Sequence, residues 1–184
     1  MVVHLKKSSL WDEPTGYLVN PVNCVGVMGA GIALEFKNSF PCMYELYRIV
    51  CTRKLLWPGD VLIYHSDQHV VINVATKGHY KYRSKLRYIK DVVSNLNVLY
   101  PNQTEQPLMG MPKIGAGAGG LDWNFVQYQL EQLVFDVNVY TGEFRAQPQS
   151  EQFPYMVLVS KGVSYPEVLT KEDYYATQDY VNSL

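Results

Sequence analysis

The chain is poor in cysteine and has no excess of charge of either sign. Its three cysteines, Cys24, Cys42 and Cys51, are an odd set without C-x-x-C spacing, and no charged-then-apolar leader opens the chain. Both features favour a reducing, cytoplasmic compartment. Lys and Arg number 16 and Asp and Glu number 17, so the molecule as a whole has no electrostatic bias towards nucleic acid or a membrane. Any such bias must be local.

Long apolar runs are also absent. None approaches the ~18 residues that a membrane-spanning helix needs, so no membrane segment is expected. With 184 residues, of which 47% are hydrophobic, the chain is long enough to bury the core of one domain. We find no internal repeat, and we expect a monomer.

Apolar segments bounded by turn residues alternate along the chain with segments of helical periodicity. Strands are predicted at Val2–Leu5, Gly16–Val22, Asp60–Tyr64, Val70–Ala75, Leu108–Ile114 and Phe135–Tyr140. Helices are predicted at Ile32–Asn38, Cys42–Lys54, Ser84–Tyr100 and Asn124–Val134. Several strands are uninterrupted apolar runs, which suits a sheet buried on both faces. This alternation predicts a layered α/β domain, whose ligands bind beyond the carboxyl ends of the strands.

The composition changes after Phe144. Residues 145–154 are a polar linker, followed by a predicted strand at Tyr155–Ser160 and a predicted short helix at Lys171–Asn182. We therefore expect a main domain at residues 1–144 and an extension at residues 145–184 that packs on it or on a partner. Residues 151–184 contain five Asp or Glu and two Lys, which argues against a nucleic-acid arm.

Two glycine-rich turns are the most informative feature of the sequence. Gly26-Val-Met-Gly29-Ala-Gly31 and Gly115-Ala-Gly-Ala-Gly-Gly120 each follow an apolar run and each precede a helix-like segment. Glycine lets backbone N–H groups approach phosphate oxygens, and the start of a helix adds a partial positive charge. The pair of turns predicts a site that holds a diphosphate from two sides, and hence a nucleotide ligand.

Two common nucleotide motifs fit poorly. Gly115, Gly117 and Gly120 match G-x-G-x-x-G, but a dinucleotide-binding domain carries this fingerprint after its first strand, with an acid about 20 residues later. Here the motif comes late, and the acids closest to that distance, Glu131 and Asp136, lie in a predicted helix and at the start of the last predicted strand. A P-loop is absent, because neither turn ends in Gly-Lys-Ser/Thr.

Three sequence blocks resemble the macrodomain family, and their order and spacing match as well. They are residues 20–37 (NPVNCVGVMGAGIALEFK), 73–80 (NVATKGHY) and 111–123 (MPKIGAGAGGLDW). The resemblance covers about residues 1–144 and is closest to the branch of the DNA ADP-ribosyl glycohydrolases (the DarG-type antitoxins) and the terminal ADP-ribose protein glycohydrolase. It implies a three-layer α/β/α fold with a mixed central sheet and helices on both faces. It also implies an ADP-ribose pocket and hydrolysis of an ADP-ribose linkage without a cofactor.

The resemblance also implies which residues contact ADP-ribose. They are Ser9, Asn23, Val27, Met28, Gly29, Ala30, Gly31, Ile32, Thr76, Ile114, Gly115, Ala116, Gly117, Ala118, Gly119 and Gly120. Asn23 is placed against the distal ribose; the alternative is that it only caps or turns the chain. Met28 could equally be a packing residue. Many macrodomains carry Gly-Asp where this chain has Ser8-Ser9, so adenine recognition would rest on Ser9 or on a backbone group.

Lys77 is the candidate catalytic residue. It follows the predicted strand Val70–Ala75, and in the enzymes that the chain resembles the matching lysine attacks the anomeric carbon of the distal ribose. An uncharged lysine can form a Schiff base with an opened sugar, and residues 77–90 contain six Lys or Arg and no carboxylate. The alternative is a surface lysine at a strand end. One departure matters: Gly119 stands where the protein-directed glycohydrolase has an acid, and Asp122 lies three residues later, as in the DNA-directed branch.

The segment after Lys77 mixes cations with aromatic rings, which suits single-stranded nucleic acid. The candidate contacts are His79, Tyr80, Lys81 and Arg83. The alternative is the solvated face of a helix, since Leu86 and Ile89 must serve the core.

Other candidate sites are weaker. His65 and His69 have i, i+4 spacing but lie in a turn between two predicted strands, so no metal site is expected. Cys24 adjoins the first turn and could be a nucleophile, although a small buried residue is the better interpretation.

Three hypotheses for function remain. The first is a hydrolase that removes ADP-ribose from a nucleobase in DNA, the second is an ADP-ribose 1″-phosphate phosphatase, and the third is a non-catalytic ADP-ribose reader.

Overall fold

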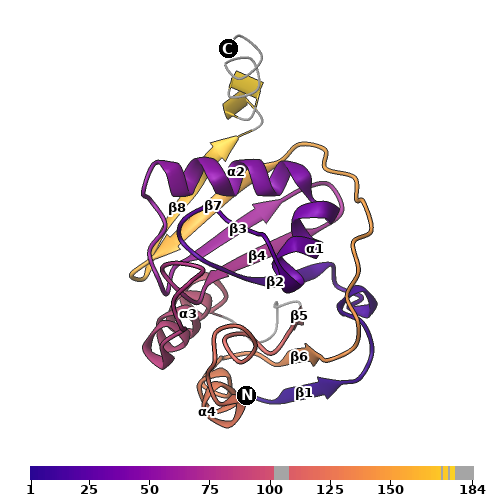
Figure 1. The fold of residues 1–184 in the computed structure, drawn as a ribbon, viewed down its shortest axis with the longest axis vertical. Coiled ribbons are helices and arrows are strands. Elements are labelled where there is room, and N and C mark those ends of the chain that lie inside the picture. Colours follow the sequence, from indigo (N-terminus) through magenta and orange to yellow (C-terminus); the bar gives the residue numbers. More distant parts are fainter. Residues whose placement is uncertain (102–107, 171, 174, 177–184) are drawn as a thin grey trace.

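The computed structural model describes residues 1–101, 108–170, 172–173 and 175–176 (Figure 1). Its helices are η1 (Leu10–Asp12), α1 (Gly31–Ser39), α2 (Pro41–Thr52), α3 (Leu86–Leu99) and α4 (Trp123–Leu130). Its strands are β1 (Val3–Lys6), β2 (Tyr17–Val22), β3 (Val61–His65), β4 (Val70–Ala75), β5 (Met109–Met111), β6 (Val137–Tyr140), β7 (Tyr155–Ser160) and β8 (Val163–Thr170).

In the described part of the chain the strands form one mixed sheet of eight, in the order β1-β6-β5-β2-β4-β3-β7-β8. The pairs from β1 to β4 are parallel, whereas β3, β7 and β8 pair antiparallel with their neighbours. The parallel strands β2, β4 and β5 therefore end at one common edge. Since ligands bind at that edge in open α/β sheets, the topology places the candidate site there.

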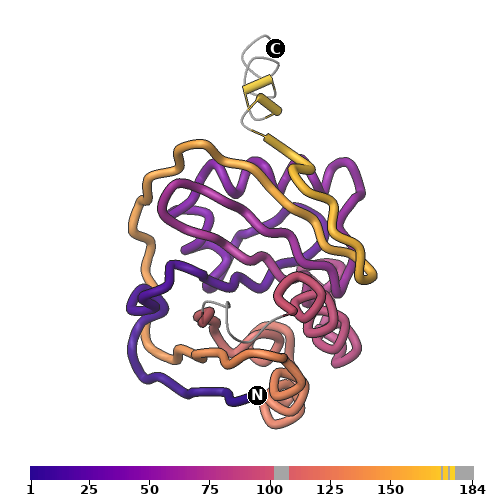
Figure 2. The backbone as a smooth tube through the Cα atoms, turned by 180° about the vertical axis from the view of Figure 1, so that it is seen from behind, coloured from indigo at the N-terminus to yellow at the C-terminus, as the bar shows by residue number. Residues whose placement is uncertain are grey.

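Helices cover both faces of the sheet. Helices α1 and α2 pack on one face with Leu18 and Val22 of β2, while α3 and α4 pack on the other with Val19. Figures 1 and 2 show the two faces from opposite sides, and α2 crosses in front of β3 and β7 in Figure 1. This arrangement confirms the three-layer α/β/α fold with a mixed sheet.

The predicted elements agree closely with those observed, with informative exceptions. Strands β4 and β7 match residue for residue. The predicted strand Leu108–Ile114 is shorter, because Pro112 has no backbone N–H to continue the ladder after Met111. Strand β8 was not predicted, because most of its side chains are exposed and it contains Pro166, as edge strands do. The predicted helix Lys171–Asn182 lies largely outside the described residues.

The polar segment after Phe144 is held to α1 along its length. Glu35 accepts a hydrogen bond from the backbone N–H of Ala146, and Ser39 Oγ accepts one from Gln147 N at 3.0 Å. Phe144 itself stacks on Trp11 at 4.7 Å between ring centroids. The polar composition of the segment after Phe144 therefore reflects hydrogen bonding to α1, and the segment is not a free linker.

Glu151 joins this segment to the start of α2. Its carboxylate accepts hydrogen bonds from Cys42 N and Met43 N, both at 3.0 Å, and from the hydroxyl of Tyr64 at 2.7 Å. A carboxylate at a helix N-terminus satisfies unpaired amides and complements the helix dipole. Burial raises the pKa of Glu151. We infer that residues 145–170 are an integral part of the fold.

We expect Glu151→Gln to lower the free energy of unfolding by about 2 kcal/mol, because a glutamine offers one acceptor oxygen where two helix amides and a tyrosine hydroxyl are now paired. Urea denaturation measures this change. Glu143→Gln is the matched control: Glu143 pairs with Arg145 in solvent, with 70% of its side chain exposed, so its loss should cost less than about 0.5 kcal/mol. Equal effects of the two changes would contradict the role of Glu151.

Candidate active site

A cavity of about 660 Å³ opens at the common edge of the parallel strands. Such a volume is typical of small-molecule sites. The lining residues come from the carboxyl ends of β2, β4 and β5 and from both glycine turns: Pro21, Val22, Asn23, Val27, Gly29, Ala30, Gly31, Ile32, Ala33, Thr76, Lys77, Tyr80, Pro112, Lys113, Gly115, Gly117, Ala118 and Gly119. Sequence reasoning placed most of them there. It did not single out Pro21, Val22, Ala33, Pro112 or Lys113, although each adjoins a predicted turn or strand end.

Five residues assigned to the ligand from the sequence do not line this cavity. Met28 and Ile114 are each 1% exposed, because their side chains point into the core beneath the two turns. Ser9 is the N-cap of η1, where its hydroxyl accepts from Trp11 N. Ala116 and Gly120 flank residues that do line the cavity.

Asn23 organises the first glycine turn. Its Nδ2 donates to Val27 O at 2.7 Å, while its Oδ1 accepts from Val25 N at 3.0 Å and from the hydroxyl of Tyr47 at 2.9 Å. Among the described residues Nδ2 has only this one hydrogen bond, so its second proton is available to a ligand. Asn23 therefore shapes the turn and also borders the cavity.

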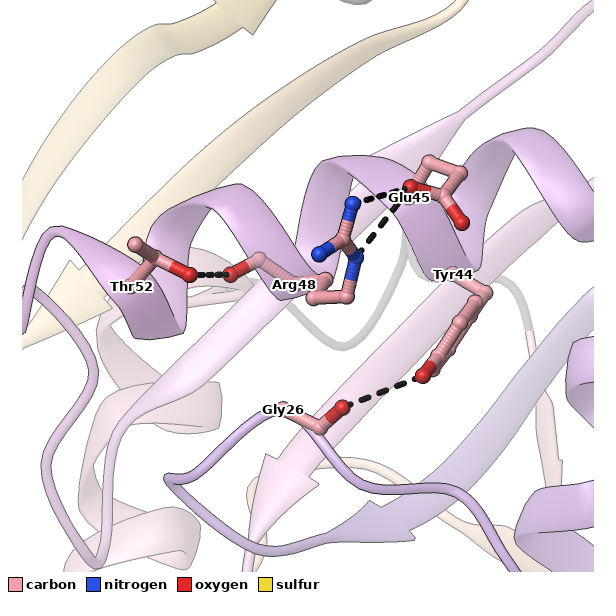
Figure 3. A network of polar contacts seen from close by, with 5 residues as sticks. All are labelled: Gly26, Tyr44, Glu45, Arg48 and Thr52. Carbon is pink, nitrogen blue, oxygen red and sulfur yellow. Dashed lines mark hydrogen bonds and ion pairs between the residues drawn. The ribbon is translucent and has the colours of Figure 1, made fainter. Parts of the chain in front are cut away.

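Helix α2 supports the same turn from outside (Figure 3). The hydroxyl of Tyr44 donates to Gly26 O at 3.3 Å, and Arg48 forms an ion pair with Glu45 at 2.9 Å. Gly26 has a φ of 81°, and a Cβ there would lie 3.4 Å from Arg48 Cγ. A glycine thus satisfies both the backbone conformation and the close packing against α2.

The start of α1 faces the cavity without a cap. Its N-cap is Ala30, no side chain of the described residues caps its amides, and its first turn contains no acid. Gly31, Ile32 and Ala33 line the cavity. Unpaired amides at a helix N-terminus form a site for an anion.

The second turn works differently. The helix that follows it, α4, is capped by Asp122, whose carboxylate accepts from Asn124 N at 2.8 Å. Asp122 therefore offsets the positive end of α4, whose partial charge the sequence analysis had counted towards phosphate binding. The second turn can offer a phosphate only its own amides.

Neighbouring side chains fix the shape of the second turn. Arg83 Nη2 donates to Gly120 O at 3.1 Å, and Ser84 N donates to Gly119 O at 2.9 Å. A Cβ on Gly119 would collide with Ser84 Oγ and would lie 2.5 Å from Gly115 O. No carboxylate could occupy position 119 without displacing the turn.

Lys77 follows β4 directly and lines the cavity. It is half-buried, and its Nζ donates to Tyr80 O at 3.5 Å. The described lining residues include two cations, Lys77 and Lys113, and no carboxylate. Lys113 Nζ lies 5.4 Å from the ring centre of Trp123. An anionic ligand would thus meet cations and backbone amides.

Of the basic and aromatic residues predicted to bind nucleic acid after Lys77, Tyr80 alone lines the cavity, and its ring stacks on His79 with centroids 4.3 Å apart. Lys81 is exposed, with its Nζ 5.9 Å from the centre of the Tyr80 ring. Arg83 instead turns to the second glycine turn.

The cysteine and histidine residues considered as weaker candidate sites have structural surroundings. Burial raises the pKa of Cys24 to about 12 and that of Cys51 to about 11, so both thiols are uncharged and unreactive near neutrality. His65 stacks on Tyr155 at 4.5 Å, whereas His69 contacts Phe40 edge-on.

The described residues contain no group of three or more His, Cys, Asp or Glu suited to a metal. None of their helices combines the length and apolar character that a bilayer crossing requires.

Comparison with known proteins gives a consistent result. A family model described as Macro domain matches residues 19–129. A DNA ADP-ribosyl glycohydrolase of Thermus aquaticus is 32% identical over 130 residues, which are 68% of this chain and 36% of that protein. Its counterpart in Mycobacterium tuberculosis is 38% identical over 120 residues, 63% of this chain and 34% of that protein. The chain thus spans about a third of the length of these curated relatives.

A solved structure and a shorter match add to this comparison. The macrodomain of Mycobacterium tuberculosis DarG aligns with a TM-score of 0.66 at 31% identity, over 81% of this chain and 99% of that one. An ADP-ribose 1″-phosphate phosphatase of Aspergillus clavatus matches over 50 residues at 40% identity, 27% of this chain and 25% of that protein.

Two glycines of the second turn, Gly117 and Gly119, differ in the space that surrounds them. We expect Gly119→Ala to lower the free energy of unfolding by about 1–3 kcal/mol, because the added methyl group meets backbone that cannot yield cheaply. Gly117→Ala is the control: a Cβ there has nothing within 4 Å, so the change should stay below about 1 kcal/mol. Thermal and urea denaturation of both variants test this difference, and equal stabilities would refute the described packing.

Proposed function

The chain belongs to the macrodomain family, and from this we propose that it is an ADP-ribosyl glycohydrolase, which releases ADP-ribose from a modified nucleobase in DNA. The observation that carries the proposal is the cavity that combines both glycine turns with Lys77 and, among the described lining residues, has no carboxylate. The names of the relatives, which match 68% and 63% of the chain, support a DNA substrate.

The diphosphate of ADP-ribose would lie between the start of α1 and the second turn. The uncapped amides of α1 supply hydrogen-bond donors at the positive end of a helix dipole, and the 115–119 backbone supplies donors from the opposite side. The second Nδ2 proton of Asn23 is suited to a hydroxyl of the distal ribose. Binding would then need no metal or cofactor.

Lys77 would act as the nucleophile. Its Nζ, reacting as the free amine, attacks C1″ of the distal ribose, and the bond from C1″ to the base nitrogen breaks, with its electron pair and one of the two amine protons going to the base. Opening of the ribose ring moves the amine proton to O4″ and leaves a Schiff base. Water then adds to C1″, the carbon–nitrogen bond to lysine breaks, and the ring closes to give ADP-ribose and free Lys77.

The lack of an acid supports this route over carboxylate assistance. Position 119 has no room for a side chain, and Asp122 is engaged in capping α4. The Lys77 amine therefore attacks C1″ directly, in place of a water molecule activated by a general base.

We further propose that the protein acts as a cytoplasmic monomer on single-stranded DNA, as an antitoxin that reverses a DNA modification. Tyr80, which is exposed and lines the cavity with Lys77, and the exposed Lys81 support contact with a strand of nucleic acid. A phosphatase that acts on ADP-ribose 1″-phosphate is the second candidate, which the shorter match to such an enzyme favours.

Gly117→Glu should abolish binding of ADP-ribose. The new side chain has space to be accommodated without disturbing the fold, but it brings a negative charge to where the diphosphate lies. Titration calorimetry with free ADP-ribose measures the loss, with Gly117→Ala as the control that keeps its affinity. If Gly117→Glu bound ADP-ribose with unchanged affinity, the cavity could no longer be assigned as the ADP-ribose site.

Lys77→Ala should reduce release of ADP-ribose from modified DNA by on the order of a thousandfold or more, while binding of free ADP-ribose is kept. Lys77→Arg should be equally inactive, because a guanidinium stays protonated and cannot form a Schiff base. Lys90→Ala, an exposed position on α3, is the control with full activity. Borohydride added during turnover should trap an adduct on Lys77.

Two other outcomes would redirect the assignment. An active Lys77→Arg would reduce the lysine to an electrostatic role. Release of phosphate from ADP-ribose 1″-phosphate, without release of ADP-ribose from DNA, would favour the phosphatase.

A further inference from the structure

A second, smaller cavity lies beside the candidate active site. Its volume is about 160 Å³, and its lining includes Trp57, Asp60, Asp91, Ser94 and Lys161. These residues come from the turn before β3, from α3 and from the turn between β7 and β8. This is about a quarter of the volume of the large cavity, so the small cavity suits one planar ring rather than a whole nucleotide.

The two cavities are separated by the short segment that carries Lys77. Gly59 N donates to Ala75 O at 2.8 Å, and a Cβ on Gly78 would lie 3.5 Å from Pro58 Cγ. Pro58 and Gly59 line the small cavity, whereas Thr76 and Lys77 line the large one. A group next to the reacting base could therefore reach the small cavity.

One buried side chain ties the walls of the small cavity together. Asn95 is 3% exposed; its Nδ2 donates to Gly59 O at 2.9 Å and its Oδ1 accepts from Gly162 N at 2.9 Å. Figures 1 and 2 both show the β7–β8 turn beside α3. Because Lys161 and Gly162 have φ values of 50° and 77°, the turn is of the tight two-residue type that fixes its position. The walls of the small cavity are thus held in place by hydrogen bonds and by a tight turn.

The turn before β3 presents an aromatic ring at the cavity. Trp57 is 63% exposed, and its backbone is fixed by hydrogen bonds from Trp57 N to Asp60 Oδ2 at 2.8 Å and from Asp60 N to Trp57 O at 3.0 Å. At Gly59 the φ is 93°, and a Cβ there would lie 2.6 Å from Asp91 Cβ, so only glycine lets the turn approach α3 this closely. An exposed tryptophan ring on a turn with a fixed backbone is a stacking platform for a base.

The polar groups that line the small cavity indicate which substituents a bound nucleobase should have. Asp91 and Ser94 are exposed on α3, and Lys161 is exposed on the hairpin turn. A carboxylate repels phosphate but accepts hydrogen bonds from the exocyclic amine of a base. The second carboxylate of the lining, Asp60, is buried and accepts a hydrogen bond from Trp57 N, so Asp91 is the carboxylate that faces solvent.

We propose that this cavity holds the nucleobase adjacent to the ADP-ribosylated base, and that it prefers a base with an exocyclic amine over thymine. The inference rests on the proposed function, since it extends the DNA substrate beyond the modified nucleotide. It assigns a role in substrate recognition to the hairpin that follows residue 154, which closes one side of the cavity.

Trp57→Ala tests the stacking. We expect hydrolysis of a single-stranded oligonucleotide with one ADP-ribosylated base to fall about tenfold in kcat/KM, while hydrolysis of an ADP-ribosylated mononucleoside is unchanged. Phe125→Ala, which removes an aromatic ring that is 62% exposed on α4, is the matched control and should affect neither substrate. An equal effect of Trp57→Ala on both substrates, or no effect on either, would overturn the proposal.

Asp91→Asn tests the preference. Oligonucleotides that carry adenine, cytosine, guanine or thymine on either side of the modified base should be hydrolysed at different rates by the parent protein, and the variant should narrow the difference between amine-bearing bases and thymine. A parent protein indifferent to the neighbouring base would refute the preference.

A binding experiment separates this inference from the proposed function. Hydrolysis of the mononucleoside by the parent protein reports on the function alone. Fluorescence anisotropy with an unmodified, labelled single-stranded oligonucleotide reports on strand binding without hydrolysis: Trp57→Ala should weaken binding about fivefold or more, and Phe125→Ala should not. Unchanged binding of Trp57→Ala would overturn the inference even if the enzyme is active.

Discussion

The parallel pairing of β2 with β4 determines the geometry of the candidate active site. The register runs from Tyr17 opposite Val70 to Val22 opposite Ala75, and Thr76 N extends the ladder to Val22 O at 3.1 Å. The first glycine turn and the segment of Lys77 therefore leave the sheet at the same height. A shift of one residue would reverse the direction of every side chain on the moved strand and dismantle the site.

A buried amide pair stands in the middle of this register. Asn20 and Asn73 face each other on β2 and β4, are fully buried, and share a hydrogen bond of 3.0 Å from Asn20 Nδ2 to Asn73 Oδ1. Asn20 Oδ1 and Asn73 Nδ2 have no protein partner among the described residues. An apolar pair would avoid that cost, but it would tolerate other registers, whereas the hydrogen bond between these two buried amides forms only when they lie opposite one another.

The sequence predicted those parts of the molecule whose pattern is local. Uninterrupted apolar runs identified β4 and β7, and the glycine turns identified most of the cavity lining. Strand β8 was missed because its place depends on pairing with β7 rather than on its own alternation. Met28 lies within a turn that has no periodicity, so only tertiary packing decides that it points to the core while Val27 and Gly29 border the cavity. The small cavity beside Trp57 could not be predicted, because it joins three segments that are distant in the sequence.

The uncapped start of α1 and the cation-bearing lining also have a consequence for turnover. The groups that would bind the diphosphate of a modified base bind the diphosphate of the released product equally well, since no bond to the phosphates changes in the reaction. Departure of ADP-ribose must break the same contacts with the α1 amides and the 115–119 backbone, without repulsion from any carboxylate among the described lining residues. In the proposed reaction, departure of ADP-ribose would therefore limit how often one molecule turns over.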